Sequence, residues 1–114
     1  MSDTIEQEIQ AKGLTAPRVT PQDLEDNIQS EHYFTAADGV YATAGVSTRI
    51  PDTLNRLTIC ILVLRNGFTV TGESACVSAK NFDAEIGRKI ARENAVEKLW
   101  PLMGYALADK LQGS

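Results

Sequence analysis

Two strand-like segments, residues 57–64 and 68–75, flank the dipeptide Asn66-Gly67, and this arrangement constrains the fold more than any other feature of the chain. Asn-Gly between two strand-forming runs is a strong signal for a β-hairpin turn. The segment 57–64 is apolar at almost every position, so both of its faces are suited to burial. We therefore expect an antiparallel hairpin over 56–75 that is covered on both faces. One cover should be a helix, and the other a further layer or a second subunit.

The second strand of this hairpin loses bulk after residue 71. Gly72, Ser74, Ala75 and Cys76 are all small, and only Glu73 among them is large. Small residues in a strand indicate that something approaches the backbone closely. A helix, a second subunit or a ligand would each explain this thin stretch.

The hairpin also predicts the state of the two cysteines. A two-residue turn at 66–67 would pair Cys60 with Glu73 and Cys76 with Leu57. In that register the two thiols lie on opposite faces and cannot form a disulfide within the sheet. We expect two free thiols.

Helical patterns flank the hairpin on both sides. A short helix is expected over 2–12, ending at Gly13, and another over 21–31, with Thr20 as its N-cap and Pro21 in its first turn. The segment 35–55 is rich in Thr, Ala and Gly and shows no clear periodicity. Within it, 40–43 is the one candidate for a short strand.

The longest predicted helix spans 82–100, capped by Asn81 or Ser78, and Trp100-Pro101 should break or bend it before a shorter helix over 102–111. Two sides of this helix carry side chains of different size. One is a seam of large residues, and the other carries small residues that let a neighbouring backbone approach. The seam is Phe82, Ile86 and Ile90, and the small residues are Ala84, Ala91 and Ala95.

Together these elements predict an α+β fold: a small antiparallel sheet around the central hairpin (56–75), packed by the long C-terminal helix (82–100) and assembled as a homo-oligomer. Residues 1–19 form a polar N-terminal segment and linker, and residues 20–111 form a single domain. The length of 114 residues suits one domain with a real core.

Charge and composition exclude several function classes. The net charge of −4 argues against duplex nucleic acid as a partner, because binding duplexes relies on many Lys and Arg contacts to phosphates. No apolar run reaches the roughly 20 residues that a membrane helix needs. The amino terminus, MSDTIEQEIQ, is acidic and polar and does not resemble a signal peptide. We expect a protein of the host cytoplasm with no membrane contact.

Catalytic and metal-binding patterns are weak. Gly72-Glu73-Ser74-Ala75-Cys76 resembles a nucleophile elbow without its last glycine, but a strand continues where the elbow needs a sharp turn into a helix. His32 is the one histidine and the one candidate base. Cys60, Cys76 and His32 lack the spacing of a zinc site. We predict a protein that is not an enzyme and uses no metal or cofactor.

The basic residues allow two interpretations. Arg88 and Arg92 lie one turn apart on the long helix with Lys89 between them, and Arg65 lies in the hairpin. In the simpler interpretation they form a solvated face paired with nearby glutamates. In the other, arginine forks grip a phosphate beside the thin strand, and an aromatic ring stacks on the ligand. The candidate ligand-binding residues are Arg65, Arg88, Arg92, Ser74, Phe82 and Trp100, and Tyr33, Phe34 and Tyr41 are further candidates for stacking.

The strings NGFTVTGESACV (66–77), NFDAEIGRKIARENAVEKLW (81–100) and LMGY (102–105) resemble a family of small proteins from tailed phages and prophages, the gp-forty-nine-like phage proteins. The resemblance covers roughly residues 17–111 and includes HYFTAADGV (32–40). It implies a phage accessory protein and not a virion enzyme. Met103 departs from the family pattern, in which we expect an acidic residue.

A fainter, architectural likeness, in a hairpin followed by a long C-terminal helix, points to the Thoeris anti-defence sponge proteins. Those phage proteins bind cyclic nucleotide-like immune signals without cleaving them and assemble as oligomers. Architecture alone does not carry function. Two hypotheses follow: the chain sequesters a small anionic nucleotide, such as a cyclic nucleotide or a cyclic ADP-ribose isomer, or it binds a host protein through an exposed surface that includes the 35–55 segment.

Overall fold

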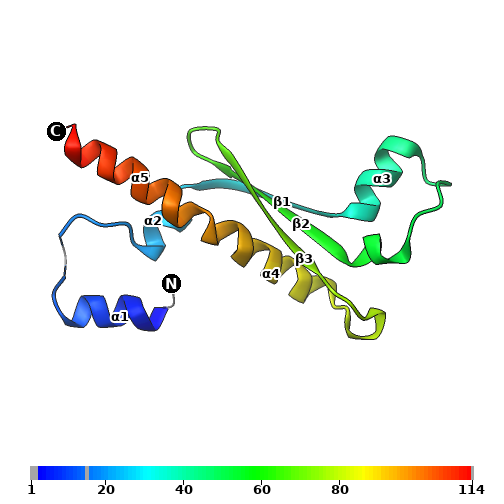
Figure 1. Cartoon of the computed structure of the whole chain (residues 1–114), viewed down its shortest axis with the longest axis horizontal. Helices are drawn as coiled ribbons and strands as arrows, with labels where there is room; N and C mark the ends of the chain where they lie inside the picture. Colours follow the sequence, from blue (N-terminus) through cyan, green and yellow to red (C-terminus); the bar gives the residue numbers. More distant parts are fainter. Residues whose placement is uncertain (1–2, 15, 114) are drawn as a thin grey trace.

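A three-stranded antiparallel sheet with the order β1-β2-β3 forms the centre of the molecule in a computed structural model that describes residues 3–14 and 16–113 (Figure 1). The predicted α+β class is confirmed. The strands are β1 (Ile28–Thr35), β2 (Leu57–Leu64) and β3 (Thr69–Ala75). The helices are α1 (Asp3–Ala11), α2 (Pro21–Asp26), α3 (Ala36–Ala44), α4 (Ala84–Glu97) and α5 (Leu99–Gln112), with short 3₁₀ turns η1 (Asp52–Arg56) and η2 (Ala79–Asn81).

The hairpin between β2 and β3 is confirmed, but its predicted register is wrong by one residue. The Leu64 N–H donates to the Phe68 carbonyl at 2.8 Å, and the Gly67 N–H donates to the Leu64 carbonyl at 2.9 Å. The loop therefore has three residues, 65–67, and Gly67 takes a positive φ of 88° as the bulge residue after the turn. The shift places Cys60 opposite Gly72 instead of Glu73. Both cysteines are free thiols, as predicted.

Helix α4 crosses the sheet directly over the thin part of β3. A Cβ atom on Gly72 would lie 2.9 Å from Ala95 Cα and closer still to the Ala91 carbonyl oxygen and the Ala95 nitrogen. Ala91 and Ala95 are fully buried in this contact. The strand is therefore thin because a helix backbone lies against it, which confirms one of the three explanations.

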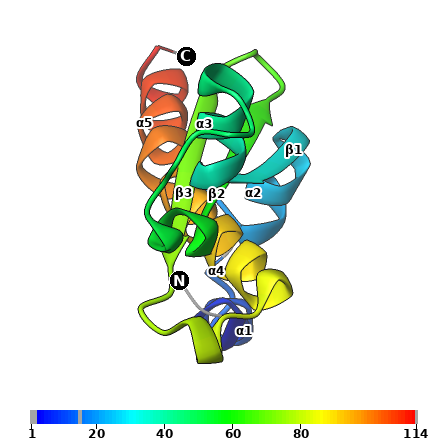
Figure 2. The ribbon, with the colours of Figure 1, turned by 90° about the vertical axis from the view of Figure 1, so that its right-hand side faces the viewer.

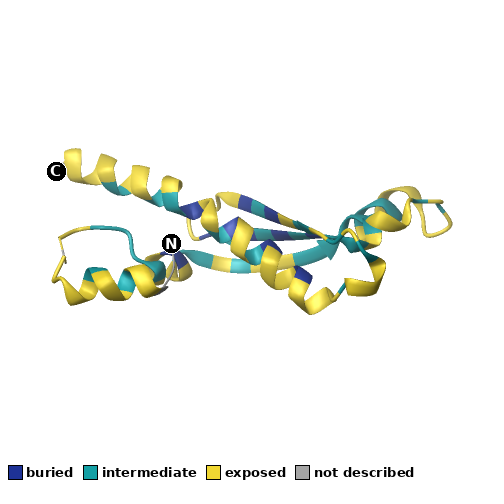
Figure 3. Ribbon diagram, turned by 60° about the horizontal axis from the view of Figure 1, so that its bottom comes forward, coloured by how far each residue is buried: buried dark blue, intermediate teal, exposed yellow. Residues whose placement is uncertain are grey.

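The sheet packs on the small-residue side of α4 and not on its large-residue seam. Ile86 is 55% exposed and Ile90 is 43% exposed, while Gly87 is buried against Thr58 of β2. Figure 3 shows the buried positions gathered where α4 faces the strands. The core is one-sided and consists of Leu24, Cys60, Leu62, Leu64, Val70, Ala91, Ala95 and Leu99.

Two predictions before the hairpin are wrong. The helix expected over 21–31 ends at Asp26 with Asn27 as its C-cap, and strand β1 begins one residue later. The residues expected to form a short strand at 40–43 lie within α3. Thr35 caps this helix by accepting a hydrogen bond from the Asp38 N–H, and Asp38 in turn accepts one from the Thr35 N–H.

The terminal helices agree better with expectation. Helix α1 ends at Ala11, two residues before Gly13, and Ser2, which the predicted helix included, lies outside the described residues. A break between the last two helices is present, but it lies at Lys98 instead of at Trp100-Pro101. Helix α4 ends at Glu97 and α5 begins at Leu99, so Trp100 and Pro101 lie in the first turn of α5. The N-cap of α4 is Asp83 instead of Asn81 or Ser78, and its carboxylate accepts from the Ile86 N–H at 3.0 Å.

The molecule is long and narrow, with extents of 56 × 30 × 16 Å. Helix α5 projects beyond the hairpin loop at one end, and α3 lies at the other (Figure 1). Figure 2 views the molecule from the α3 end and shows α3 in front of the strands. The N-terminal helix α1 is joined to the linker by the Arg18–Glu6 ion pair.

Candidate binding site

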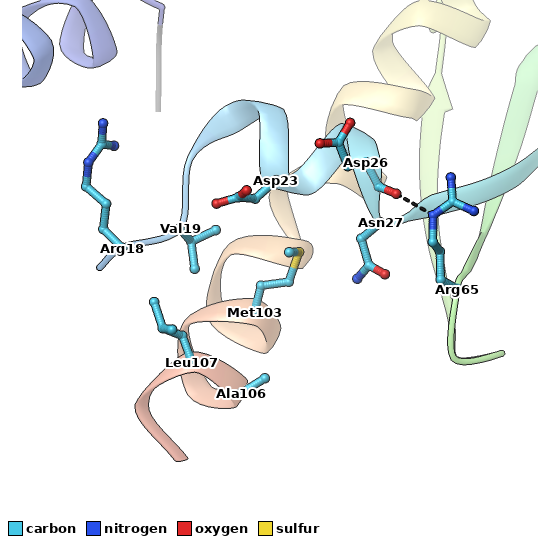
Figure 4. A pocket seen from close by; sticks show the side chains of 9 residues that line it. All are labelled: Arg18, Val19, Asp23, Asp26, Asn27, Arg65, Met103, Ala106 and Leu107. Atoms are coloured by element: carbon cyan, nitrogen blue, oxygen red, sulfur yellow. Dashed lines mark hydrogen bonds between the residues drawn. The ribbon is translucent and has the colours of Figure 1, made fainter. Parts of the chain in front are cut away.

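A hollow with a volume of about 450 Å³ lies at the α5 end of the molecule, between α2, the hairpin loop and α5 (Figure 4). We call it the α5 groove. Its location follows from the break before Leu99: α5 leaves the sheet there and passes beside α2 instead of resting on a strand. The groove is lined by Arg18, Val19, Asp23, Asp26, Asn27, Arg65, Met103, Ala106 and Leu107.

Apolar side chains form one wall of the groove. Met103 and Leu107 project from α5 and face Val19 of the linker (Figure 4). Val19 and Met103 also pack against the core cluster, which holds this wall in place. A smaller hollow of about 200 Å³ shares Met103 and continues toward Phe68 of the hairpin.

The polar side chains around the groove are held by local hydrogen bonds. Asp23 accepts from the Thr20 N–H at 2.9 Å as part of the capping box of α2. Asp26 accepts from the side-chain amide of Gln22 at 2.8 Å. These hydrogen bonds fix the two carboxylates beside the arginines, and the charge of Asp23 helps to raise the pKa of Arg18.

Two arginines stand on opposite sides of the groove (Figure 4). Arg65 donates from Nε to the Asp26 carbonyl at 2.6 Å, and its own backbone N–H donates to the Asn27 carbonyl at 3.0 Å. Within residues 3–14 and 16–113, its two terminal nitrogens make no hydrogen bond. These contacts fix the hairpin loop against the end of α2 and leave the outer edge of the guanidinium available.

Arg18 makes a bidentate pair with Glu6, at 2.7 Å and 2.8 Å. The hydrogen bonds from Arg18 and Gln10 lower the pKa of the Glu6 carboxyl to about 2, and the same pair raises the pKa of Arg18. Arg18 therefore stays charged at the mouth of the groove and ties α1 to it.

Arg92, one of the predicted ligand residues, forms a clamp between three elements. Its Nε donates to Glu31 of β1 at 3.1 Å, and its Nη2 donates to Glu25 of α2 at 2.9 Å. Partial burial raises the pKa of Glu31, but hydrogen bonds from Arg92 and Tyr33 outweigh it and the net pKa is lowered. The hydrogen bond that Arg92 donates to Glu25 is the largest cause that raises the pKa of Arg92.

The remaining predicted ligand residues do not converge with Arg65. Ser74 and Phe82 line a separate hollow of about 220 Å³ beside the start of α4, at the far end of the hairpin. Arg88 is exposed on α4, and Trp100 packs against the core cluster. Of the six candidates, only Arg65 lines the α5 groove. Sequence reasoning missed Arg18, Asn27 and Met103, because no motif signals that a linker, a helix end and α5 will meet.

The residues weighed for catalysis or metal binding are dispersed. Ser74 lies within β3, so no sharp turn presents it as a nucleophile. The His32 ring lies 3.0 Å from the Ser30 hydroxyl, and burial raises the pKa of the Cys60 thiol. No group of three or more His, Cys, Asp or Glu in the described ranges is arranged to hold a metal ion. None of the described helices has the length and apolar character required to cross a membrane.

Comparison with known proteins identifies the family. Residues 19–111 match the profile of the phage protein (N4 Gp49/phage Sf6 gene 66) family. No curated protein and no solved structure matches the chain significantly. Because the match spans most of the chain, including the sheet, α4 and α5, the protein belongs to this phage family.

Proposed function

We propose that this phage protein binds a small anionic nucleotide in the α5 groove and sequesters it without cleaving it. The observation that supports the proposal most strongly is the pairing of an apolar wall with two arginines, Arg18 and Arg65, around a hollow of about 450 Å³. The ligand class is that of host immune signals such as cyclic nucleotides or cyclic ADP-ribose isomers.

The size and chemistry of the groove suit such a ligand. Small-molecule sites usually measure about 300–1,000 Å³ and combine apolar walls with a few polar groups that orient the ligand. Met103 and Leu107 offer an apolar surface for a base, and the Asn27 amide can both donate to and accept from base edges. Arginine forks bind phosphate oxygens in pairs, and the outer edge of Arg65 is available for this contact.

The charge balance of the groove limits the ligand. Arg18 and Arg65 are matched in number by Asp23 and Asp26. A long polyanion would meet both carboxylates, whereas a compact ligand with one or two phosphates can contact the free edge of Arg65 alone. Each guanidinium nitrogen of Arg18 already donates to Glu6 or to the Leu14 carbonyl, so Arg18 acts on such a ligand through its charge. This balance favours a small nucleotide over a nucleic acid strand, in keeping with the net charge of −4.

A thermal-shift panel tests the proposal, using cyclic dinucleotides, cyclic trinucleotides and cyclic ADP-ribose isomers as probes. A ligand at about 100 times its dissociation constant adds about 2.7 kcal/mol to the free energy of unfolding. For a domain of about 100 residues this raises Tm by roughly 10 °C or more. Recovery of the intact nucleotide, checked by mass spectrometry, would separate a binder from an enzyme. A flat panel would contradict the proposal.

Matched variants localise the site. Arg65→Gln should remove most of the thermal shift, and Arg49→Gln, in an exposed loop, should leave it unchanged. Arg18→Gln should weaken binding. Glu6→Gln is its control, because it removes the same ion pair but leaves the positive charge of residue 18 in the chain. A shift that survives Arg65→Gln and Arg18→Gln but disappears in Arg88→Gln would place the ligand on α4 instead.

Binding to a host protein is a second candidate, favoured by exposed aromatic side chains at this end of the molecule. Phe68 is 54% exposed and lines the adjoining hollow, and Tyr105 is 75% exposed on the side of α5 opposite Met103 and Leu107. Aromatic residues at an exposed surface are typical anchors of protein interfaces. Retention of a host protein by the wild type and by Arg65→Gln, but not by Tyr105→Lys, would favour this candidate over the nucleotide.

A further inference from the structure

The smaller hollow of about 200 Å³ beside the α5 groove extends that groove toward the hairpin. We call it the Phe68 hollow. Three lining residues, Asn27, Met103 and Ala106, belong to both hollows, so the two are continuous. Small-molecule sites usually measure about 300–1,000 Å³, and the Phe68 hollow is below this range. Its size suits one ring system of a ligand whose remaining part lies in the α5 groove.

The Phe68 hollow has an aromatic and aliphatic wall that the core does not use. Phe68 is 54% exposed and Leu102 is 39% exposed, and both line this hollow. Neither belongs to the core cluster or to the residues packed against it. Aromatic side chains bind nucleotide bases by stacking, and this contact tolerates any base because every base has a π-face. Phe68 is therefore placed to hold a base without disturbing the sheet.

Polar groups with free donors lie where the two hollows meet. The Asn66 side-chain oxygen accepts from the Phe68 N–H at 2.9 Å. In the part of the chain that the structure describes, the Asn66 amide nitrogen and the Asn27 side-chain amide make no hydrogen bond. Asn27 lies between Arg65 and Met103 (Figure 4), and Arg65 precedes Asn66 in the hairpin loop. The loop therefore carries a cation into one hollow and an amide into the other.

We propose that the two hollows form one site for a dinucleotide, an assignment that rests on the proposed function and narrows its ligand class. One base lies against Met103 and Leu107 in the α5 groove, and the second base stacks on Phe68. The free edge of Arg65 binds a phosphate that joins the two nucleosides. A ligand with a single base fills only one apolar wall and gives up the stacking contact of the other.

Two ligand types of equal phosphate content separate the contributions of the two hollows. A cyclic dinucleotide and a cyclic ADP-ribose isomer each carry two phosphates, but only the dinucleotide carries a second base. Arg65 should contribute to the binding of both ligands, because both offer phosphate oxygens. Phe68 should contribute only to the binding of the dinucleotide.

Calorimetric titration of the full chain with cyclic di-AMP, cyclic di-GMP and cyclic ADP-ribose tests the proposal. The tighter of the two dinucleotides should bind about tenfold or more tightly than cyclic ADP-ribose, as expected for one stacked base. Phe68→Ala should abolish this preference and leave the affinity for cyclic ADP-ribose unchanged. Phe68→Tyr is the matched control, because it keeps an aromatic ring and should keep the preference. The exposed position of Phe68 makes unfolding by either change unlikely to confuse the result, and a thermal melt checks this.

The outcomes distinguish this inference from the proposed function. Equal affinities for dinucleotide and cyclic ADP-ribose, unchanged in Phe68→Ala but both reduced in Arg65→Gln, would overturn the dinucleotide site and leave the nucleotide-binding groove intact. Loss of both ligand types in a folded Phe68→Ala variant would also overturn it, because Phe68 would then contact the part that the ligands share. A wild-type chain that binds none of the three nucleotides would overturn both proposals.

Discussion

Helices α4 and α5 follow one another in the chain but meet the rest of the molecule in different ways. On α4, Ala91 and Ala95 lie directly on the backbone of β3 at Gly72, and no room remains for another atom. On α5, Met103 and Leu107 stand beside α2 with a groove between them. Tight packing suits a scaffold and open packing suits a binding surface, so under the proposed function the two helices would divide these tasks at the break before Leu99.

The largest effect should come from filling the α4 contact. Gly72→Ala places a methyl group against the backbone of α4, which cannot move aside as a side chain could. We expect it to lower the free energy of unfolding by about 3 kcal/mol or more. In a thermal melt this corresponds to a fall in Tm of more than about 10 °C.

Gly104→Ala is the matched control on α5, where an added Cβ meets no atom of the described residues within 4 Å. Alanine favours a helix over glycine by up to about 1 kcal/mol, so this variant should be neutral or more stable. Equal losses of Tm in both variants would contradict the difference between the two helices.

A smaller effect is expected from the clamp between α4, β1 and α2. Arg92→Met removes the partner of Glu25 and Glu31, and we expect a loss of about 1 kcal/mol, because the three side chains are partly exposed and solvent screens the pair. Arg88→Met, at an exposed position one turn earlier, should change stability by less than about 0.5 kcal/mol. Urea unfolding of both variants measures the difference. If Arg88→Met lowered the free energy of unfolding more than Arg92→Met, the clamp would not be the arginine contact that stabilises α4 most.

Substitutions in the α5 groove should change the binding affinity more than the free energy of unfolding. Met103→Glu puts a carboxylate, the residue type that the family resemblance leads us to expect, into the wall of the α5 groove. It should weaken the binding of an anionic nucleotide by about tenfold or more, because like charges repel inside the hollow. A tenfold rise in Kd corresponds to about 1.4 kcal/mol of binding free energy. Calorimetric titration measures the change, and an unaltered affinity would argue that the nucleotide does not contact this wall.

The smallest expected effect is a dependence of the local stability of α1 on pH. The pKa of Glu6 is about 2 in the folded chain and near 4.5 when unpaired, so Arg18 stabilises the charged carboxyl. The contribution of this ion pair to the stability of the folded state is complete above about pH 4.5 and is lost as the pH falls toward 2. Amide exchange in α1 should therefore accelerate over this range, and Glu6→Gln should show the faster exchange already at pH 7. Exchange that is independent of pH after correction for its intrinsic rate would contradict this role of the ion pair.

The sequence predicts the contact between α4 and the sheet better than it predicts the α5 groove. The hairpin, the small residues from Gly72 onward and the alanines of α4 are local signals, and each describes a contact that the structure contains. The α5 groove depends on where a linker, the end of α2 and a hairpin loop meet. Such a meeting is set by tertiary packing, and no local pattern reports it.

The specific errors have physical causes. Residues 28–31, the first half of β1, are predicted as the end of a helix because Leu24 and Ile28 have helical spacing, but pairing with β2 overrides that preference. The register error comes from Gly67, whose positive φ allows a three-residue loop where two residues were expected. Thr35 and Asp38 repeat the capping pattern of Thr20 and Asp23, so α3 carried a readable start signal.

The most direct test of the central claim, that the α5 end binds and the α4 end supports, is chemical-shift mapping by NMR with the nucleotide that gives the largest thermal shift. We predict that the perturbed amides will cluster at Arg18, Asn27, Arg65, Met103 and Leu107. Amides of α4 and of the adjoining part of β3 should change little. Perturbations centred on Ser74, Phe82 and Arg88 instead would contradict the account, because they would place the ligand on the scaffold side.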